Sequence, residues 1–156
     1  MVVRTFLSQS KIVKKPLKQS YPEHPQTVGE HIRKKRLDNR QTQLEVGTQI
    51  GVKENTLTTW EVGRYVPQVN HYPAIIAYLG YYPFIHETDS IAGKLLQVRY
   101  SYGWNCKEFG EILEADTATV RRWELYKSPV HPRVHNKIMD LWNALPYQLT
   151  QKYLSF

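Results

Sequence analysis

From Thr27 onward, apolar residues recur at the three- and four-residue spacing of short amphipathic helices, and polar breaks separate these stretches. No run alternates apolar and polar residues for long enough to predict a sheet. The spacing predicts a helix of about fourteen residues from Thr27, a short helix from Gln43, a tight turn near Gly51 and a third helix through Trp60. The sequence therefore predicts an all-α fold.

The same pattern occurs twice along the chain. A shift of 63 residues aligns two segments without a gap and places Trp60 on Trp123, each followed by a glutamate. The other aligned pairs are Arg36 with Arg99, Glu45 with Glu108, Gly47 with Gly110, Thr56 with Thr119, Val28 with Ile91, Ile32 with Leu95, Val46 with Phe109, Ile50 with Leu113 and Leu57 with Val120. We therefore predict two tandem units: unit one at 26–87, and unit two at 88–156, which ends in a helical tail.

Capping residues locate the helix starts independently of the repeat. Thr27 with Glu30 and Thr42 with Glu45 have the capping-box spacing, in which a threonine is followed three residues later by a glutamate. The unit-two counterparts are Asn105 with Glu108, which keep that spacing, Ser90, which is followed by Gly93, and Asp116, an expected N-cap of the third helix.

Unit two departs from unit one at its turns. Glu114 stands where unit one has Gly51, and Tyr126 stands where it has Gly63. A residue other than glycine rarely adopts a positive φ, so we expect the turns of unit two to be remodelled or strained. In unit one, residues 39–41 are polar, so the sequence does not determine where the first helix ends.

Charge and composition narrow the class of protein. The net charge is +7, and the first 25 residues carry five cations, Arg4, Lys11, Lys14, Lys15 and Lys18, against the single acid Glu23. We interpret residues 1–25 as a flexible basic arm and expect a polyanionic partner. The longest apolar run, 74–79, is too short to cross a bilayer, so we expect no membrane partner. With no signal-peptide pattern and the single Cys106, we expect a cytoplasmic protein.

Two short helices joined by a glycine-containing turn are typical of the helix-turn-helix motif, whose second helix enters the major groove of DNA. The segments 43–52 (QLEVGTQIGV) and 56–64 (TLTTWEVGR) resemble the phage-repressor and Xre-type (lambda-repressor-like) regulators of transcription. The resemblance is close over 22–84 and looser over 89–130, so unit two looks like a degenerate copy. It implies a five-helix domain, which the apolar stretch 74–81 closes.

The resemblance implies that the third helix reads bases and that the N-terminus of the second helix binds phosphate. Helical spacing opposite Leu57 and Trp60 gives the expected base-reading residues as Lys53, Glu54, Asn55, Thr58 and Thr59. The expected phosphate contacts are Thr42, Gln43, Arg64, Arg33 and Lys34. A possible second reading surface in unit two consists of Thr117, Arg121 and Arg122, although Glu111, Glu114 and Asp116 lie close by and would repel phosphate.

Several conspicuous residues have structural explanations. The resemblance implies internal ion pairs between Arg36 and Glu61 and between Arg99 and Glu124. Trp60 and Trp123 are expected in the core. His131 and His135 have the spacing of a helical metal pair, but without further ligands we interpret them as surface histidines and expect no metal and no cofactor.

We expect sequence-specific binding of double-stranded DNA by a transcriptional regulator. The alternative is an antitoxin-like or adaptor module in which unit two binds a protein partner or a second copy of the chain. Exposed aromatic residues would form that interface: Tyr81, Tyr82, Phe84, Trp142, Tyr147, Tyr153 and Phe156. The same residues could instead pack between the two units. We find no constellation typical of an enzyme.

Overall fold

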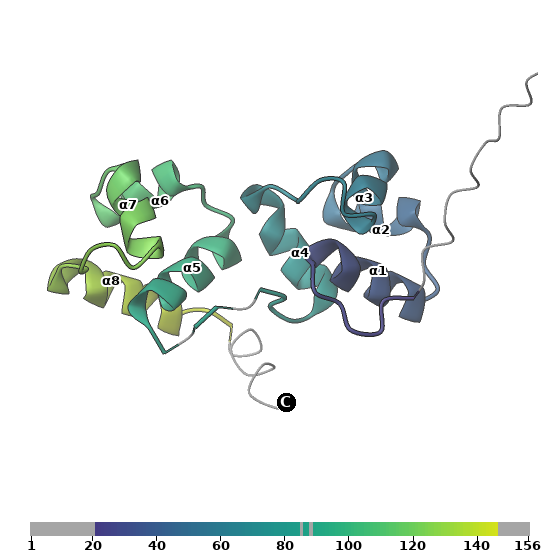
Figure 1. The fold of residues 1–156 in the computed structure, drawn as a ribbon. Coiled ribbons are helices and arrows are strands. Elements are labelled where there is room, and N and C mark those ends of the chain that lie inside the picture. Colours follow the sequence, from purple (N-terminus) through teal and green to yellow (C-terminus); the bar gives the residue numbers. More distant parts are fainter. Residues whose placement is uncertain (1–20, 85, 88, 147–156) are drawn as a thin grey trace, which may run out of the picture.

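The computed structural model describes residues 21–84, 86–87 and 89–146 (Figure 1). All regular structure in these residues is helical, which confirms the predicted all-α fold. The helices are α1 (Val28–Asp38), α2 (Gln43–Ile50), α3 (Glu54–Glu61), a 3-10 helix η1 (Val69–His71), α4 (Tyr72–Leu79), α5 (Ile91–Tyr102), α6 (Cys106–Leu113), α7 (Thr117–Glu124) and α8 (Pro132–Asn143). Most of the predicted basic arm and the last ten residues of the C-terminal tail, including Tyr147, Tyr153 and Phe156, lie outside the described residues.

Helix starts lie where the capping residues predict them. Thr27, Thr42 and Asn105 each form a complete capping box with the glutamate three residues later. Ser90 accepts a hydrogen bond from the backbone N–H of Gly93, and Asp116 accepts one from that of Thr119. Hydrogen bonds from Thr119 lower the pKa of the Asp116 carboxyl group, so the cap is charged at neutral pH.

The buried side chains form two separate hydrophobic cores. The first core lies among α1–α4, which we call the first group, and contains Ile32, Val46, Leu57 and Trp60 together with the apolar face of α4. The second core lies among α5–α8, which we call the second group, and includes Trp123. In Figure 1 the two groups lie side by side, with α4 and α5 next to each other between them.

The repeat extends to the backbone conformation. In the first group, Arg40, Gly51 and Gly63 have φ values of 55°, 83° and 70°. The residues 63 positions later, Gly103, Glu114 and Tyr126, have φ values of 74°, 56° and 56°. Of the two outcomes expected for the turns of the second copy, remodelling is wrong and strain is what the structure contains, because Glu114 and Tyr126 adopt the left-handed conformation of the glycines that they replace.

Left-handed turns also end the first helices. Both α1, with 11 residues, and α5, with 12, are shorter than the length of about fourteen that the spacing predicted. The Gln41 N–H donates to the Arg36 carbonyl, and at the equivalent place the Trp104 N–H donates to the Arg99 carbonyl. The chain therefore leaves both helices by the same hydrogen-bonded turn, which the polar residues 39–41 do not reveal in the sequence.

We expect Arg40→Gly to raise the free energy of unfolding by about 0.5–1 kcal/mol, because glycine adopts this conformation without the clash of a Cβ atom. The Arg40 side chain is exposed, so little contact is lost. Urea denaturation measures the change. Asn39→Gly is the matched control: Asn39 has an ordinary φ of −84°, so glycine there should lower stability, and a gain at Asn39 equal to that at Arg40 would contradict the explanation.

Aromatic side chains join the two groups. Tyr72 of α4 packs against Tyr100 of α5 with ring centroids 4.9 Å apart, and Phe84 and His86 also contact Tyr100. Tyr82 is 3% exposed and packs against Phe84. The interpretation of Tyr82 and Phe84 as an exposed protein interface is therefore wrong. The alternative, that these residues pack between the two halves of the chain, is what the structure shows.

Two other residues of the suggested interface also have internal partners. The His31 ring nitrogen Nδ1 lies 2.8 Å from the Tyr81 hydroxyl oxygen. The Trp142 indole N–H donates to Gln97 Oε1 at 2.8 Å, and Trp142 is half-buried. Of the seven aromatic residues considered for a partner surface, the four that the structure describes thus all contribute to internal packing.

Candidate functional site

The first turn of α3 presents three exposed polar side chains, Lys53, Glu54 and Asn55. On its opposite side, α3 packs against α1 and α2 through the buried residues Leu57 and Trp60. In Figure 1, α3 lies on the far side of the first group from α5–α8, so the second group does not cover it. The helix therefore offers its polar side to a partner from solution.

Thr58 and Thr59 are less available than we expected. Both are half-buried. The Thr58 hydroxyl lies 3.0 Å from Gln43 Oε1 and 2.9 Å from the Glu54 carbonyl oxygen, and the Thr59 hydroxyl donates to the Thr56 carbonyl at 2.7 Å. Because both hydroxyl groups have partners within the protein, direct contact with a ligand would rely on their methyl groups.

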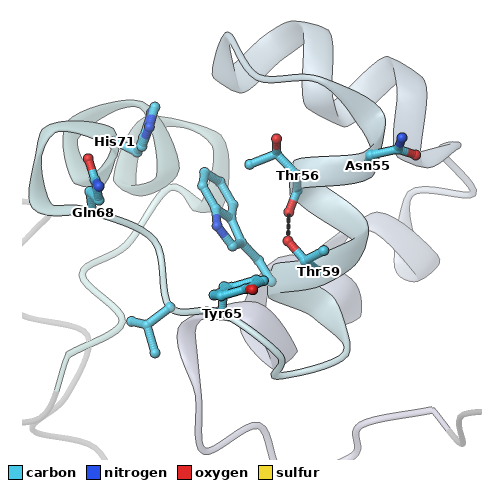
Figure 2. Close-up of a pocket in the computed structure, with 8 residues that line it drawn as sticks. Asn55, Thr56, Thr59, Tyr65, Gln68 and His71 are labelled. Atoms are coloured by element: carbon cyan, nitrogen blue, oxygen red, sulfur yellow. Dashed lines mark hydrogen bonds between the residues drawn. The ribbon is translucent and has the colours of Figure 1, made fainter.

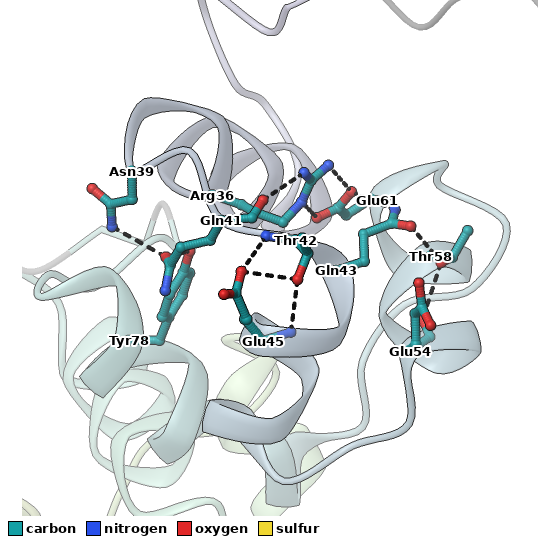
Figure 3. A network of polar contacts seen from close by, with 10 residues as sticks. All are labelled: Arg36, Asn39, Gln41, Thr42, Gln43, Glu45, Glu54, Thr58, Glu61 and Tyr78. Atoms are coloured by element: carbon teal, nitrogen blue, oxygen red, sulfur yellow. Dashed lines mark hydrogen bonds and ion pairs between the residues drawn. The ribbon is translucent and has the colours of Figure 1, made fainter.

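A buried polar network holds α3 against the other helices (Figure 3). Arg36 of α1 donates two hydrogen bonds to the Glu61 carboxylate, Nε to Oε1 at 2.6 Å and Nη2 to Oε2 at 2.8 Å. Its third contact runs from Nη1 to the Gln41 carbonyl at 3.2 Å. The Glu61 side chain is only 1% exposed, and the ion pair raises the pKa of the Arg36 guanidinium further above its ordinary value. This pair, expected between the first and third helices, is present.

The amide of Gln43 extends this network to the surface of α3. Its Nε2 donates to Glu61 Oε2 at 2.9 Å, while its Oε1 faces the Thr58 hydroxyl. Gln43 thus links Glu61 at the end of α3 to Thr58 in its middle, as Figure 3 shows. We expected this side chain to bind phosphate, but it is committed within the protein instead.

The N-terminus of α2 is also engaged internally. Glu45 Oε2 accepts hydrogen bonds from the Thr42 N–H at 2.6 Å and from the Thr42 hydroxyl at 2.8 Å. These bonds lower the pKa of the Glu45 carboxyl group, so a negative charge lies beside the expected phosphate seat. The side chain of Thr42 is therefore not free for the phosphate contact that the sequence suggested.

A tyrosine from α4 closes the other end of the network. The Tyr78 hydroxyl donates to Gln41 Oε1 at 3.0 Å, and Asn39 Nδ2 donates to the same oxygen at 3.3 Å. Burial raises the pKa of Tyr78 to about 12, so the hydroxyl group keeps its proton throughout the physiological range. The network therefore ties α1, α3 and α4 together beneath the exposed turn of α3.

The remaining expected phosphate contacts lie in different places. Arg64 is exposed directly after α3 and can accompany Lys53 and Asn55. Lys34 points to the segment before α1, where its ammonium group donates to the Glu23 carbonyl at 2.8 Å and lies over the Tyr21 ring. Arg33 is half-buried on α1. Of these cations, Arg64 is exposed close to the end of α3, and Lys34 is engaged with the segment before α1.

The second group repeats the network with one replacement. Arg99 Nε donates to Glu124 Oε1 at 2.5 Å, and Arg99 Nη1 donates to the Trp104 carbonyl at 3.1 Å. Cys106 takes the place of Gln43, with its Sγ 3.9 Å from Glu124 Oε2. The expected second ion pair is present, whereas the link from the second helix to the third is reduced to one weak contact.

The outer side of α7 carries the possible second reading surface. Arg121 and Arg122 are exposed, and Thr117 is half-buried. Arg122 donates to the Thr119 hydroxyl at 2.9 Å. The nearby Glu114 carboxylate pairs with Arg133 at 3.1 Å and with Lys137 at 3.7 Å, both from α8. Its charge is thereby compensated, which weakens the repulsion of phosphate that we expected at this edge.

A hollow that the sequence did not reveal lies between α3 and the segment leading to η1 (Figure 2). It has a volume of about 560 Å³. Its lining consists of Asn55, Thr56, Thr59, Trp60, Tyr65, Val66, Gln68 and His71. Tyr65 and Val66 are 66% and 77% exposed. The sequence places the two sides of the hollow up to 16 residues apart, and only the path of residues 62–71 brings them together.

Within the described ranges, no group of three or more His, Cys, Asp or Glu side chains is placed to hold a metal ion. His131 has a local role, since its Nδ1 accepts the Arg133 N–H at the start of α8. Across the described parts of the chain, every helix is too short or too polar to traverse a bilayer.

Comparisons with protein-family models, with curated proteins and with solved structures found no match to this chain.

Proposed function

We propose that this chain binds double-stranded DNA in a sequence-specific way, with α2 and α3 acting as a helix-turn-helix motif and α3 entering the major groove. The observation that carries the proposal is the exposed polar first turn of α3, which is not covered by the second group and is held from behind by a buried ion pair. The proposal also draws on the resemblance of residues 22–84 to the phage-repressor and Xre-type regulators, and it makes the protein a regulator of transcription.

The exposed side chains suit the edges of base pairs. The amide of Asn55 can donate to and accept from adenine at the same time, and the Glu54 carboxylate can accept from the amino group of cytosine. Lys53 and Arg64, one before and one after α3, can contact phosphates on either side of the groove. A rigid support favours such reading, because the contacts with bases then form without an entropic cost of ordering the helix.

The second group is, in this proposal, a degenerate copy of the same motif. Its α5, α6 and α7 keep the turn, the capping box of the second helix and the ion pair of the first group, but Ala118 replaces Asn55 and Asp116 replaces Lys53. The arginines of α7 make it a candidate second reading surface, and α4 and α5 fix its position relative to α3. A site bound by both groups would be asymmetric in sequence.

Selection of bound duplexes from a random DNA pool tests the proposal. A defined consensus is expected, and a pool that stays random after repeated rounds would contradict it. On the selected site, Asn55→Ala is expected to weaken binding by about 5- to 150-fold, because a good bidentate contact contributes about 1–3 kcal/mol of discrimination. The preference at one base pair should be lost at the same time.

Asn136→Ala is the matched control, because Asn136 is also an exposed asparagine but lies on α8 in the second group. Its affinity for the selected duplex should equal that of the unchanged protein. Equal losses for the two variants would contradict the assignment of base reading to Asn55.

A further inference from the structure

We propose that the hollow beside α3 holds a phosphate group of the DNA backbone, and that the indole N–H of Trp60 donates a hydrogen bond to it. This inference rests on the proposed function, since it assigns one contact within the same complex. It gives a ligand-binding role to Trp60, which the sequence analysis assigned to the core alone. It also explains why the two copies of the repeat differ around their equivalent tryptophans.

The two tryptophans have different hydrogen-bond environments. In the second group, the Trp123 indole N–H donates to the Pro129 carbonyl at 3.2 Å. In the first group, the Trp60 N–H has no acceptor among the described residues, although Trp60 is only 5% exposed and lines the hollow. The Trp60 indole nitrogen remains accessible to solvent within the hollow, so this donor can bind a ligand that enters.

The hollow has the chemistry of an anion site. Its polar lining groups, which come from Asn55, Thr56, Thr59, Tyr65, Gln68 and His71, are amides, hydroxyl groups and an imidazole ring, and no carboxylate is among the residues that line it. Arg64 is exposed next to Tyr65 and supplies a positive charge at the edge. The volume of about 560 Å³ greatly exceeds the roughly 30 Å³ that one water molecule occupies, so a larger polar group fits.

The position of the hollow identifies which phosphate would reach it. Asn55 belongs both to the exposed face of α3 and to the lining of the hollow, and its side chain points away from Gln68 and His71 (Figure 2). A duplex whose base edge contacts Asn55 must run its sugar-phosphate backbone along one side of α3, because the groove is bounded by two backbones. The backbone on the η1 side passes over the hollow.

The indole N–H signal of Trp60 in a proton–nitrogen NMR spectrum reports on this contact directly. The signal is identified by its absence in Trp60→Phe, and the Trp123 signal serves as an internal control because that N–H already has an acceptor. On addition of the selected duplex, we expect the Trp60 signal to move downfield and its exchange with solvent to slow, while the Trp123 signal stays in place.

Substituted duplexes identify the acceptor. In a series with one uncharged methylphosphonate at each position in turn, the shift of Trp60 should disappear for one position. A shift that persists throughout the series would mean that a protein carbonyl is the acceptor. A shift of equal size with inorganic phosphate alone would mean that the DNA backbone is not required. Either result overturns the inference.

The same spectra separate the inference from the proposed function. If the α3 amide signals move with the duplex and the Trp60 signal does not, the inference fails while the proposed function stands. If no signal moves, the proposed function fails.

A charge variant at the edge of the hollow gives a second measurement that does not disturb the core. Gln68 is exposed, so its substitutions should leave the fold intact. Gln68→Glu is expected to weaken binding of the selected duplex about tenfold more than Gln68→Ala, because a carboxylate repels phosphate. Equal affinities for the two variants would contradict a phosphate at this place.

Discussion

Replacing Glu61 by alanine is expected to lower the free energy of unfolding by about 3–5 kcal/mol, which is the usual cost of removing one partner from a buried ion pair. Glu61 accepts two hydrogen bonds from Arg36 and one from Gln43, and its side chain is 1% exposed. The substitution leaves Nε and Nη2 of Arg36 and the amide of Gln43 without this acceptor in a region that is largely shielded from water. Urea denaturation followed by circular dichroism measures the loss.

The equivalent pair in the second group is the matched control for this prediction. Glu124 accepts a hydrogen bond from Arg99, but among the described residues its other oxygen has only the Cys106 thiol at 3.9 Å, and its side chain is 12% exposed. Glu124→Ala should therefore cost less than Glu61→Ala. The double variant Arg36→Met with Glu61→Leu should recover much of the stability, because apolar residues of similar volume often replace a buried pair at little cost. A double variant as unstable as Glu61→Ala would contradict this explanation.

Local signals in the sequence predicted most of the fold. The capping boxes at Thr27, Thr42 and Asn105 depend on residues three positions apart, so the sequence alone defines them. The ion pairs came from the resemblance, which supplied a contact between positions 25 residues apart that no local pattern contains. Both kinds of information describe the helix ends and the core, where few arrangements satisfy the backbone hydrogen bonds and the buried charges at the same time.

The candidate site was harder to predict, because it depends on competition between partners. Nothing in the sequence shows whether the amide of Gln43 faces a ligand or turns to Glu61 and Thr58, since both choices satisfy its hydrogen bonds. The hollow depends on the path of residues 62–71. The second copy aligns with this segment in sequence, but the hydrogen bond from the Trp123 indole N–H to the Pro129 carbonyl has no counterpart at Trp60 among the described residues. Residues Glu114 and Tyr126 show the same limit for turns, since propensity disfavours a conformation that tertiary contacts impose.

Gly29→Ala is expected to separate α1 from α3 and to lower the free energy of unfolding by about 3 kcal/mol, at the upper end of the usual cost of overpacking a core. A Cβ atom at Gly29 would lie 1.9 Å from the Trp60 carbonyl oxygen and 2.7 Å from its carbonyl carbon, so the backbone of one helix has to move. Moving α3 also displaces Asn55, so affinity for the selected duplex should fall together with stability.

The second copy has Ala92 at the position of Gly29, 2% exposed, which makes Ala92→Gly the matched control. That variant removes a methyl group without a clash and should cost only about 1 kcal/mol. A gain in stability for Gly29→Ala in thermal denaturation, opposite in sign to the loss for Ala92→Gly, would show that helix propensity, and not the close approach of α1 to α3, determines the effect.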